Sequence, residues 1–291
     1  MSAPIDLGVY YYYGPKIYNL SPMVKQITWS GDIAEAGRKC EITLLNTLDG
    51  SNQYLSLEVG KTVHCSKNHT IFFRGVIFAT SINQKGEMVL SCRDANHYLT
   101  KNEDTLKFTN QKASQIVSTI CKQYGIPVGK IEDTAYVIPR LLLRSKTIYD
   151  MIIIALTETR KKTGKKFILT NGADGKLNLT ERKNQVVRLI VSEGNNLISA
   201  SYSESIEEMR NSIRITGKAG EDEKGVTVGS PTTIKNFGLM RKKEHEAEKT
   251  DAELKPIANA LLEELNVKTR EMSVEGVGDT SIRSGVSVQI S

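Results

Sequence analysis

The sequence predicts an α+β protein that is mainly β, in which two related small β-barrel domains flank a small α/β domain. Three observations lead to this prediction. Short apolar–polar alternating runs with turn residues recur in the first and last thirds, a stretch near the start is echoed near the end, and the middle third changes to a helical period. The expected domains are residues 1–101, 102–195 and 196–291.

The internal repeat begins with residues 27–43, which are echoed by residues 198–216. With small gaps, similar residues follow in one order: Ile33, Glu35, Arg38, Ile42 and Thr43 in the first copy, and Ile206, Glu208, Arg210, Ile215 and Thr216 in the second. A second echo relates residues 60–65 to 285–290, both of which read as a strand entered through a glycine turn. Two echoes in the same order predict a duplication with Gly60 over Gly285.

The composition fits such domains. Of the 291 residues, 39% are hydrophobic, which is enough for the cores of two or three small domains. Lysine and arginine exceed the acidic residues by only 6 charges, and these are spread along the chain, so nucleic-acid specificity is not expected. There is no apolar run of membrane-spanning length and no signal-peptide pattern. The cysteines lie far apart within apolar segments, which predicts reduced, buried thiols at Cys40, Cys65, Cys92 and Cys121.

In the first domain, alternation predicts strands at residues 9–13, 24–29, 39–45, 60–65, 70–79 and 87–92. The strands at 24–29 and 39–45 form a hairpin with a long tip, and Asp49 with Gly50 marks a turn. Gly75 stands where a bulge or sharp bend is expected. Six short strands with regular turns predict a small barrel or sandwich.

In the middle domain, the apolar stripe from Ala113 to Tyr124 predicts a helix that Gly125 terminates. A second helix is expected from the capping pair Thr147 and Asp150 to Gly164. The cations at the end of this helix, Arg160, Lys161 and Lys162, are expected to complement its dipole rather than bind a ligand. Residues 166–169 and 176–179 flank a glycine-rich turn, which predicts a hairpin. The oxygen-rich turn lacks the ligand spacing of a calcium loop, so a plain turn is expected.

The third domain carries a different insertion. Polar loops are expected at residues 221–225 and 229–231, and a stripe from Leu254 to Leu265 predicts a helix. Thr250 and Glu253 resemble a capping box, but Pro256 requires the helix to begin near Lys255 or to bend there. Because the second copy stops soon after Gly285, its closing strands are expected to be missing. Its last strand then has an exposed or partner-completed edge and is more mobile than residues 60–65.

No catalytic or cofactor-binding motif is present, so no catalytic, cofactor or metal residue is assigned and no enzymatic activity is expected. The nearest metal candidates are Cys65, His69, Cys92 and His97, whose spacing matches no common zinc signature. A Cys–His nucleophile pair drawn from these residues is no better supported. Function is therefore expected to lie in surfaces.

Five segments carry a resemblance to a known family: Phe73-Arg-Gly-Val-Ile77, Ser91-Cys-Arg-Asp-Ala-Asn-His-Tyr-Leu-Thr-Lys101, Tyr124-Gly-Ile-Pro-Val128, Thr163-Gly-Lys-Lys-Phe167 and Ser273-Val-Glu-Gly-Val-Gly-Asp-Thr-Ser-Ile-Arg-Ser-Gly285. In this order and spacing, over nearly the whole chain, they resemble the XkdQ/YqbQ-type proteins of PBSX-like prophages, which are baseplate-hub proteins of contractile tails. Contractile bacteriocins use similar parts. The family has no catalytic motif to carry over to this chain.

The resemblance implies a homotrimeric structural hub with tail-tube-like barrels, which forms a pseudo-hexameric adaptor between the tail tube and the central spike. The implied partners are the tail tube protein, the spike protein and other baseplate proteins. The implied location is the baseplate of a virion or phage-tail-like particle assembled in the bacterial cytoplasm. Two other functions stay open: a cell-wall component that binds or hydrolyses peptidoglycan through its middle domain, and a free-standing β adaptor unrelated to phage.

Overall fold

The computed structural model describes residues 6–35, 37–47, 53–184, 186–192, 194–217, 225–246 and 250–290. They fall into two compact units. The first unit lies within Met1–Ile190 together with Gly278–Ile290, and the second unit is Val191–Val277. The predicted turn at residues 49–50 and residues 221–224 of the predicted polar loop lie outside the described residues. Within the described ranges, no helix is both long and apolar enough to cross a bilayer.

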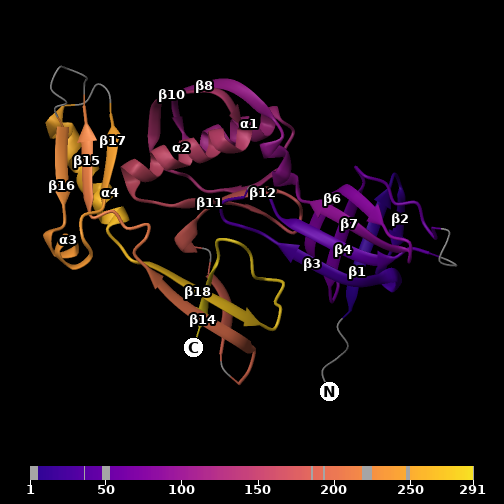
Figure 1. Cartoon of the computed structure of the whole chain (residues 1–291). Coiled ribbons are helices and arrows are strands. Elements are labelled where there is room, and N and C mark those ends of the chain that lie inside the picture. Colours follow the sequence, from indigo (N-terminus) through magenta and orange to yellow (C-terminus); the bar gives the residue numbers. More distant parts are fainter. Residues whose placement is uncertain are drawn as a thin grey trace. The chain divides into compact units, whose positions relative to one another are not determined.

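An antiparallel sheet of seven strands forms the β part of the first unit, in the order β2-β1-β5-β6-β7-β4-β3 (Figure 1). The strands are β1 (Leu7–Tyr13), β2 (Lys16–Asn19), β3 (Val24–Ser30), β4 (Lys39–Leu45), β5 (Thr62–Lys67), β6 (Thr70–Ile82) and β7 (Glu87–Arg93). Alternate residues of β4 and β7 are buried, which is the period that predicted them. The six predicted strands are confirmed, and the short β2 is additional.

The sheet is curled but open. Strands β6 and β7 separate β4 from β5 in the strand order, yet Cys40 on β4 and Cys65 on β5 lie in the same buried core cluster. Strands β2 and β3 remain as the two edges, so the described residues form no closed barrel. Closure would need these edges to pair, but β2 has only four residues and its side chains are mostly exposed. All four cysteines are buried and free, which confirms the predicted thiols.

Of the two features predicted for Gly75, a bulge or a sharp bend, the structure does not have the bulge at this residue. Gly75 lies in register opposite Val63, and the irregularities of β6 fall on either side of it, between Ile71 and Phe73 and between Ile77 and Ala79. The glycine is needed instead for a close backbone approach. A Cβ atom at this position would lie 2.5 Å from the main-chain oxygen of Arg93 on β7.

His64 on β5 is a buried histidine that is 7% exposed. Neither of its ring nitrogens has a hydrogen-bond partner among the residues that the structure describes. The ring packs against Tyr12 with the two centroids 4.4 Å apart. Burial, together with the charge of nearby Arg74, lowers the pKa of His64 from 6.5 to about 4. The folded protein therefore holds this imidazole in its neutral form.

Acid is expected to destabilise the protein through His64. Below pH 6.5 the unfolded chain takes up a proton at this residue, whereas the folded ring stays neutral down to about pH 4, so stability falls between these values. The variant His64→Phe keeps a packed ring. Between pH 7 and 4.5 its free energy of unfolding, measured in urea, should fall by about 2 kcal/mol less than that of the wild type. The control His69→Asn changes an exposed imidazole and should behave as the wild type. The same pH dependence in both variants would contradict the prediction.

Two predicted helices pack together in the first unit: α1 (Ala113–Gln123) and α2 (Ile148–Thr163). The Thr147 hydroxyl accepts the main-chain N–H of Asp150 at 3.1 Å and begins α2, and Gly164 ends it with a φ of +71°. Both helices bury the apolar stripes from which they were predicted. Arg160, Lys161 and Lys162 lie in the last turn of α2, as expected.

A ribbon of two long strands covers these helices and was not predicted (Figure 1). It consists of β8 (Glu103–Lys112) and β10 (Val137–Thr147), which are antiparallel. Phe108, Ile138 and Leu143 are buried in the core, while the exposed residues of β10 include Val137, Pro139 and Leu142. Leu141, Leu142 and Leu143 follow one another with no polar residue between them, and Pro139 precedes them, so the apolar–polar alternation that indicates a strand is broken. The predicted hairpin is confirmed as β11 (Phe167–Asn171) and β12 (Leu177–Glu181), with β9 (Val128–Ile131) parallel to β12.

The chain leaves the first unit after Ile190 and returns to it at Gly278. The returning segment ends in β19 (Ser287–Ile290), which pairs with β13 (Val186–Val191). Residues 278–290 were predicted to belong to the third domain. They group with the first unit because β13, the ladder partner of β19, lies almost entirely there. Strand β19 has one neighbour among the described strands, whereas β5 has two.

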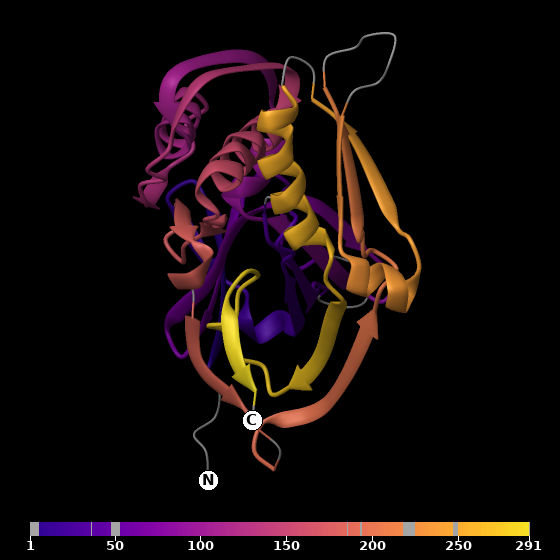
Figure 2. The same ribbon diagram turned by 90° about the vertical axis from the view of Figure 1, so that its left-hand side faces the viewer.

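The second unit contains a ribbon and a small helix-covered sheet (Figure 2). The ribbon pairs β14 (Leu197–Ser205) with β18 (Thr269–Gly276), and β15 (Ser212–Thr216) lies between β16 (Gly225–Gly229) and β17 (Arg241–His245). The two helices are α3 (Pro231–Phe237) and α4 (Asp251–Leu265). Helix α4 begins at the predicted capping box and continues through Pro256, and its Leu254 and Ala258 pack on Ile213 and Ile215. The predicted loop at residues 229–231 runs directly into α3, whose N-cap is Ser230.

The strand pairing differs between the two copies of the repeat. Strands β3 and β4 pair with each other, whereas β14 pairs with β18, and β15 pairs with β16 and β17. The prediction that residues 198–216 repeat the hairpin of residues 27–43 is therefore wrong at the level of hydrogen bonding. The insertion after residue 216 supplies β16 and β17, which occupy both edges of β15.

Candidate functional site

Arg38 is a buried cation at the end of the β3–β4 tip. Its side chain is 8% exposed. The guanidinium donates to the Asp94 carboxylate at 3.4 Å and to the main-chain oxygens of Phe72 at 3.0 Å and Asn171 at 3.5 Å. It also lies 5.7 Å from the centre of the Phe73 ring. One side chain thus joins three segments that are far apart in the sequence.

Asp94 is the buried counter-charge. It is 1% exposed and accepts the main-chain N–H of Asn96, which begins a short 3-10 helix at Ala95–Thr100. Burial raises the pKa of Asp94, and the contacts with Arg38 oppose that rise. The tip approaches this carboxylate closely because Gly37 has no side chain: a Cβ there would lie 2.6 Å from Asp94 Oδ1.

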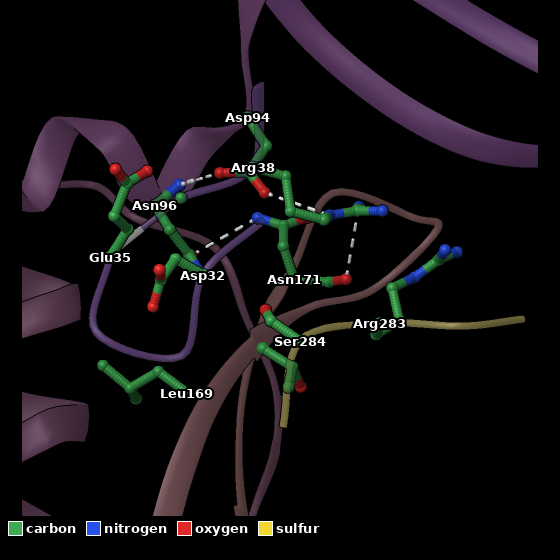
Figure 3. A pocket seen from close by; sticks show the side chains of 11 residues that line it. Asp32, Glu35, Arg38, Asp94, Asn96, Leu169, Asn171, Arg283 and Ser284 are labelled. Carbon is green, nitrogen blue, oxygen red and sulfur yellow. Dashed lines mark hydrogen bonds and ion pairs between the residues drawn. The ribbon is translucent and has the colours of Figure 1, made fainter. Parts of the chain in front are cut away.

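Two buried amides complete this side of the cluster. Asn171 Nδ2 donates to Asn96 Oδ1 at 3.3 Å, and Asn171 Oδ1 is buried without a hydrogen-bond partner in the described part of the chain. A cavity of about 20 Å³ lies beside them, with Asp32 and Glu35 on its wall (Figure 3). That volume suits a single water molecule.

Arg283, from the returning C-terminal segment, is the second cation. Its guanidinium donates to the main-chain oxygens of Thr280, Ile282 and Phe72, at 2.6, 3.3 and 3.2 Å. Phe72 O therefore accepts from both arginines, and Figure 3 shows their guanidinium groups pointing to the same side. Burial and the charge of Arg38 lower the pKa of Arg283 to about 10. Among the described residues, no carboxylate lies within 4.0 Å of it.

The residues considered for metal or nucleophile chemistry are not assembled into such a site. Cys65 and Cys92 are buried in the curled sheet. A hydrogen bond with Cys40, and burial, raise the pKa of Cys65, while burial above all raises that of Cys92, so both thiols are held protonated. His69 lies in an exposed turn and His97 in the 3-10 helix. Within the described ranges, no group of three or more potential ligands is placed to hold a metal.

What we call the arginine cluster consists of Arg38, Asp94, Asn96, Asn171 and Arg283. The sequence analysis did not identify it. Arg38 lies in the repeated stretch, Asp94 and Asn96 lie in one quoted segment, and Arg283 lies in another, but nothing local indicates that they meet. The arrangement contains no nucleophile paired with a base. Chemically, it can anchor segments to one another and recognise an anion.

Comparisons with known proteins agree with the resemblance seen in the sequence. The model of the family described as YQBQ-like matches residues 27–291. The YqbQ protein of Bacillus subtilis (strain 168) is 26% identical over 275 residues, covering 94% of this chain and 83% of that protein. The phage-like element PBSX protein XkdQ of the same strain is 27% identical, covering 94% and 84%.

A solved structure has a similar fold. The 43 kDa tail protein of prophage MuSo2 from Shewanella oneidensis superposes with a TM-score of 0.71 at 15% identity, covering 97% of this chain and 88% of that one. At this identity the likeness concerns the fold alone. The family model, in contrast, matches most of the sequence, and the chain therefore belongs to the YqbQ-like family.

Proposed function

We propose that the chain is a structural, non-enzymatic hub protein in the baseplate of a contractile phage tail or phage-tail-like particle. Support comes from its relatives: XkdQ is named as a protein of a phage-like element, and the similar Shewanella structure is named as a prophage tail protein. In this proposal three copies form a pseudo-hexameric adaptor between the tail tube and the central spike, together with other baseplate proteins. Assembly takes place in the bacterial cytoplasm before the particle is released.

The surface through which the copies are proposed to associate is the β14–β18 ribbon. Nearly every residue of both strands is exposed, and large side chains are among them: Ile198 is 65% exposed, Tyr202 57% and Met272 53%. A two-stranded ribbon is only marginally stable by itself in water, and exposed apolar side chains gathered in one place favour association. The proposed occupant of this surface is a second copy of the chain.

The proposed symmetry rests on the repeat in the sequence, although the strand pairing of its two copies differs. Six tube subunits cannot be matched by three identical one-domain chains without leaving alternate contacts empty. Three chains with related domains at residues 1–101 and 196–291 present six similar faces, and the open edges β2 and β3 of the first sheet allow further strands to be added. The domain at residues 102–195 then projects outward, where it does not block contacts within the ring.

The proposal predicts a trimer that charge can disrupt. The wild-type chain is expected to sediment as a trimer at micromolar concentration, and Tyr202→Asp combined with Met272→Asp should give a monomer, because buried unpaired carboxylates oppose association. Leu142→Asp in the ribbon of β8 and β10 is the control, since Leu142 is also 40% exposed but lies in the outward domain. A wild-type chain that stays monomeric, or a double variant that stays trimeric, would contradict the assignment of this surface.

A further inference from the structure

A second cavity adjoins the arginine cluster within the first unit. Its volume is about 460 Å³. The wall contains Trp29 at the end of β3, Arg38, and Ile282, Arg283 and Ser284 from the returning segment. It thus combines two guanidinium groups with a hydroxyl and an apolar surface.

Each of the two arginines has N–H donors that are not used in the hydrogen bonds described above. A guanidinium carries five N–H donors. Arg38 gives hydrogen bonds to three acceptors, and so does Arg283. Two N–H groups on each therefore have no acceptor in the described part of the chain and can donate to a ligand or to water.

The charges at the cavity are also unbalanced. Asp94 is paired with Arg38 and does not line this cavity, while the acceptors of Arg283 in the described part of the chain are all main-chain oxygens. Asp279 lines the cavity too, but hydrogen bonds from Ser281, with the charge of Lys67, lower its pKa and already stabilise its charge. A guest anion would offset the burial of Arg283.

We propose that this cavity binds a carboxylate group. A planar carboxylate has two oxygens that accept from paired N–H groups, which suits two neighbouring guanidiniums. Ser284 adds a hydroxyl donor, and Trp29 with Ile282 provides an apolar wall for a short aliphatic stem. The ligand class is therefore the side chain of glutamate or aspartate in an acidic peptide, or a small free carboxylate of the same shape. This site does not depend on the proposed hub function.

The test uses Trp29, which is the only tryptophan of the chain and lines the cavity. Its fluorescence is followed while the full chain is titrated at constant ionic strength with glutarate, and separately with the blocked peptide acetyl-Ala-Glu-Ala-amide. A saturable change is expected with at least one of the two probes. Binding by both indicates the carboxylate alone, and binding by the peptide alone indicates an acidic segment of a partner.

Variants separate this site from a general charge effect. Arg283→Gln is expected to weaken binding about tenfold or more, because a charge-assisted hydrogen bond is lost. Lys39→Gln removes a cation of the same unit that pairs with Glu41 and does not line the cavity, and should bind as the wild type. If Arg283→Gln does not fold, the variant Ile282→Asp tests carboxylate binding instead. It places a competing carboxylate in the cavity and should abolish binding, while Ile282→Asn should retain it.

Three results would overturn the proposal: no saturable change in the wild type with either probe, equal affinity in Arg283→Gln, or sulfate bound as strongly as glutarate. None of them bears on whether the chain trimerises.

Discussion

Replacing Arg38 by methionine is expected to lower the free energy of unfolding by about 3–5 kcal/mol, the cost of breaking a buried ion pair from one side. Methionine fills part of the space but leaves Asp94, which is 1% exposed, as an unpaired buried carboxylate. Two main-chain oxygens, of Phe72 and Asn171, lose a donor as well. Urea unfolding at pH 7 measures the change.

The pH dependence identifies the cause. Burial already raises the pKa of Asp94, and removal of Arg38 raises it further, so the folded variant takes up a proton more readily than the unfolded one. The penalty should therefore shrink as the pH falls from 7 to 5. The exposed pair Lys25–Glu87 gives the matched control, because Lys25→Met is expected to cost less than about 1 kcal/mol. A loss of similar size in both variants would refute the role assigned to burial.

Gly75→Ala is expected to cost about 3 kcal/mol, even though alanine adds a single methyl group. That methyl would lie 2.5 Å from Arg93 O and 2.7 Å from the Phe73 ring, and a main-chain oxygen in a paired strand cannot move without disturbing the ladder. Hydrogen exchange should show faster opening of β6 and β7 than of α1.

Gly278→Ala serves as the control for Gly75→Ala, since a Cβ at residue 278 has nothing within 4 Å. Its free energy of unfolding should stay within about 0.5 kcal/mol of the wild type. If Gly75→Ala were equally neutral, the strands would have to be farther apart than the structure places them.

The features that the sequence predicted well are those that depend on neighbouring residues. Helix α2 was predicted with both ends because Thr147, its apolar stripe and Gly164 lie within one short segment. Strand pairing is a different matter, because the alternating pattern of β15 indicates a strand but not its neighbours. The ribbon of β8 and β10 was missed because three successive leucines and Pro139 break the apolar–polar alternation of β10.

The arginine cluster could not be predicted from the sequence, because its residues are far apart in the chain. Arg38 and Arg283 meet at Phe72 O although 245 positions separate them in the chain, and Asn171 comes from a third region. A lone arginine in a loop normally indicates a solvated charge. Only the fold of the first unit shows that Arg38 is buried and that Arg283 is partly buried beside it.

Because the chain returns to the first unit at Gly278, the first unit can be completed only after the second unit has been synthesised. Strand β13 can pair with β19, and Arg283 can reach the carbonyl of Phe72, only after the whole of Val191–Val277 has been translated. At typical bacterial rates of about 5–20 residues per second, roughly 5–20 s pass between the synthesis of Ile190 and that of Arg283. During this interval the nascent first unit exposes an unpaired β13 and an unfilled place beside Arg38. A ribosome-bound chain stalled before residue 278 should therefore be cleaved by protease more readily in residues 1–190 than the released full-length protein.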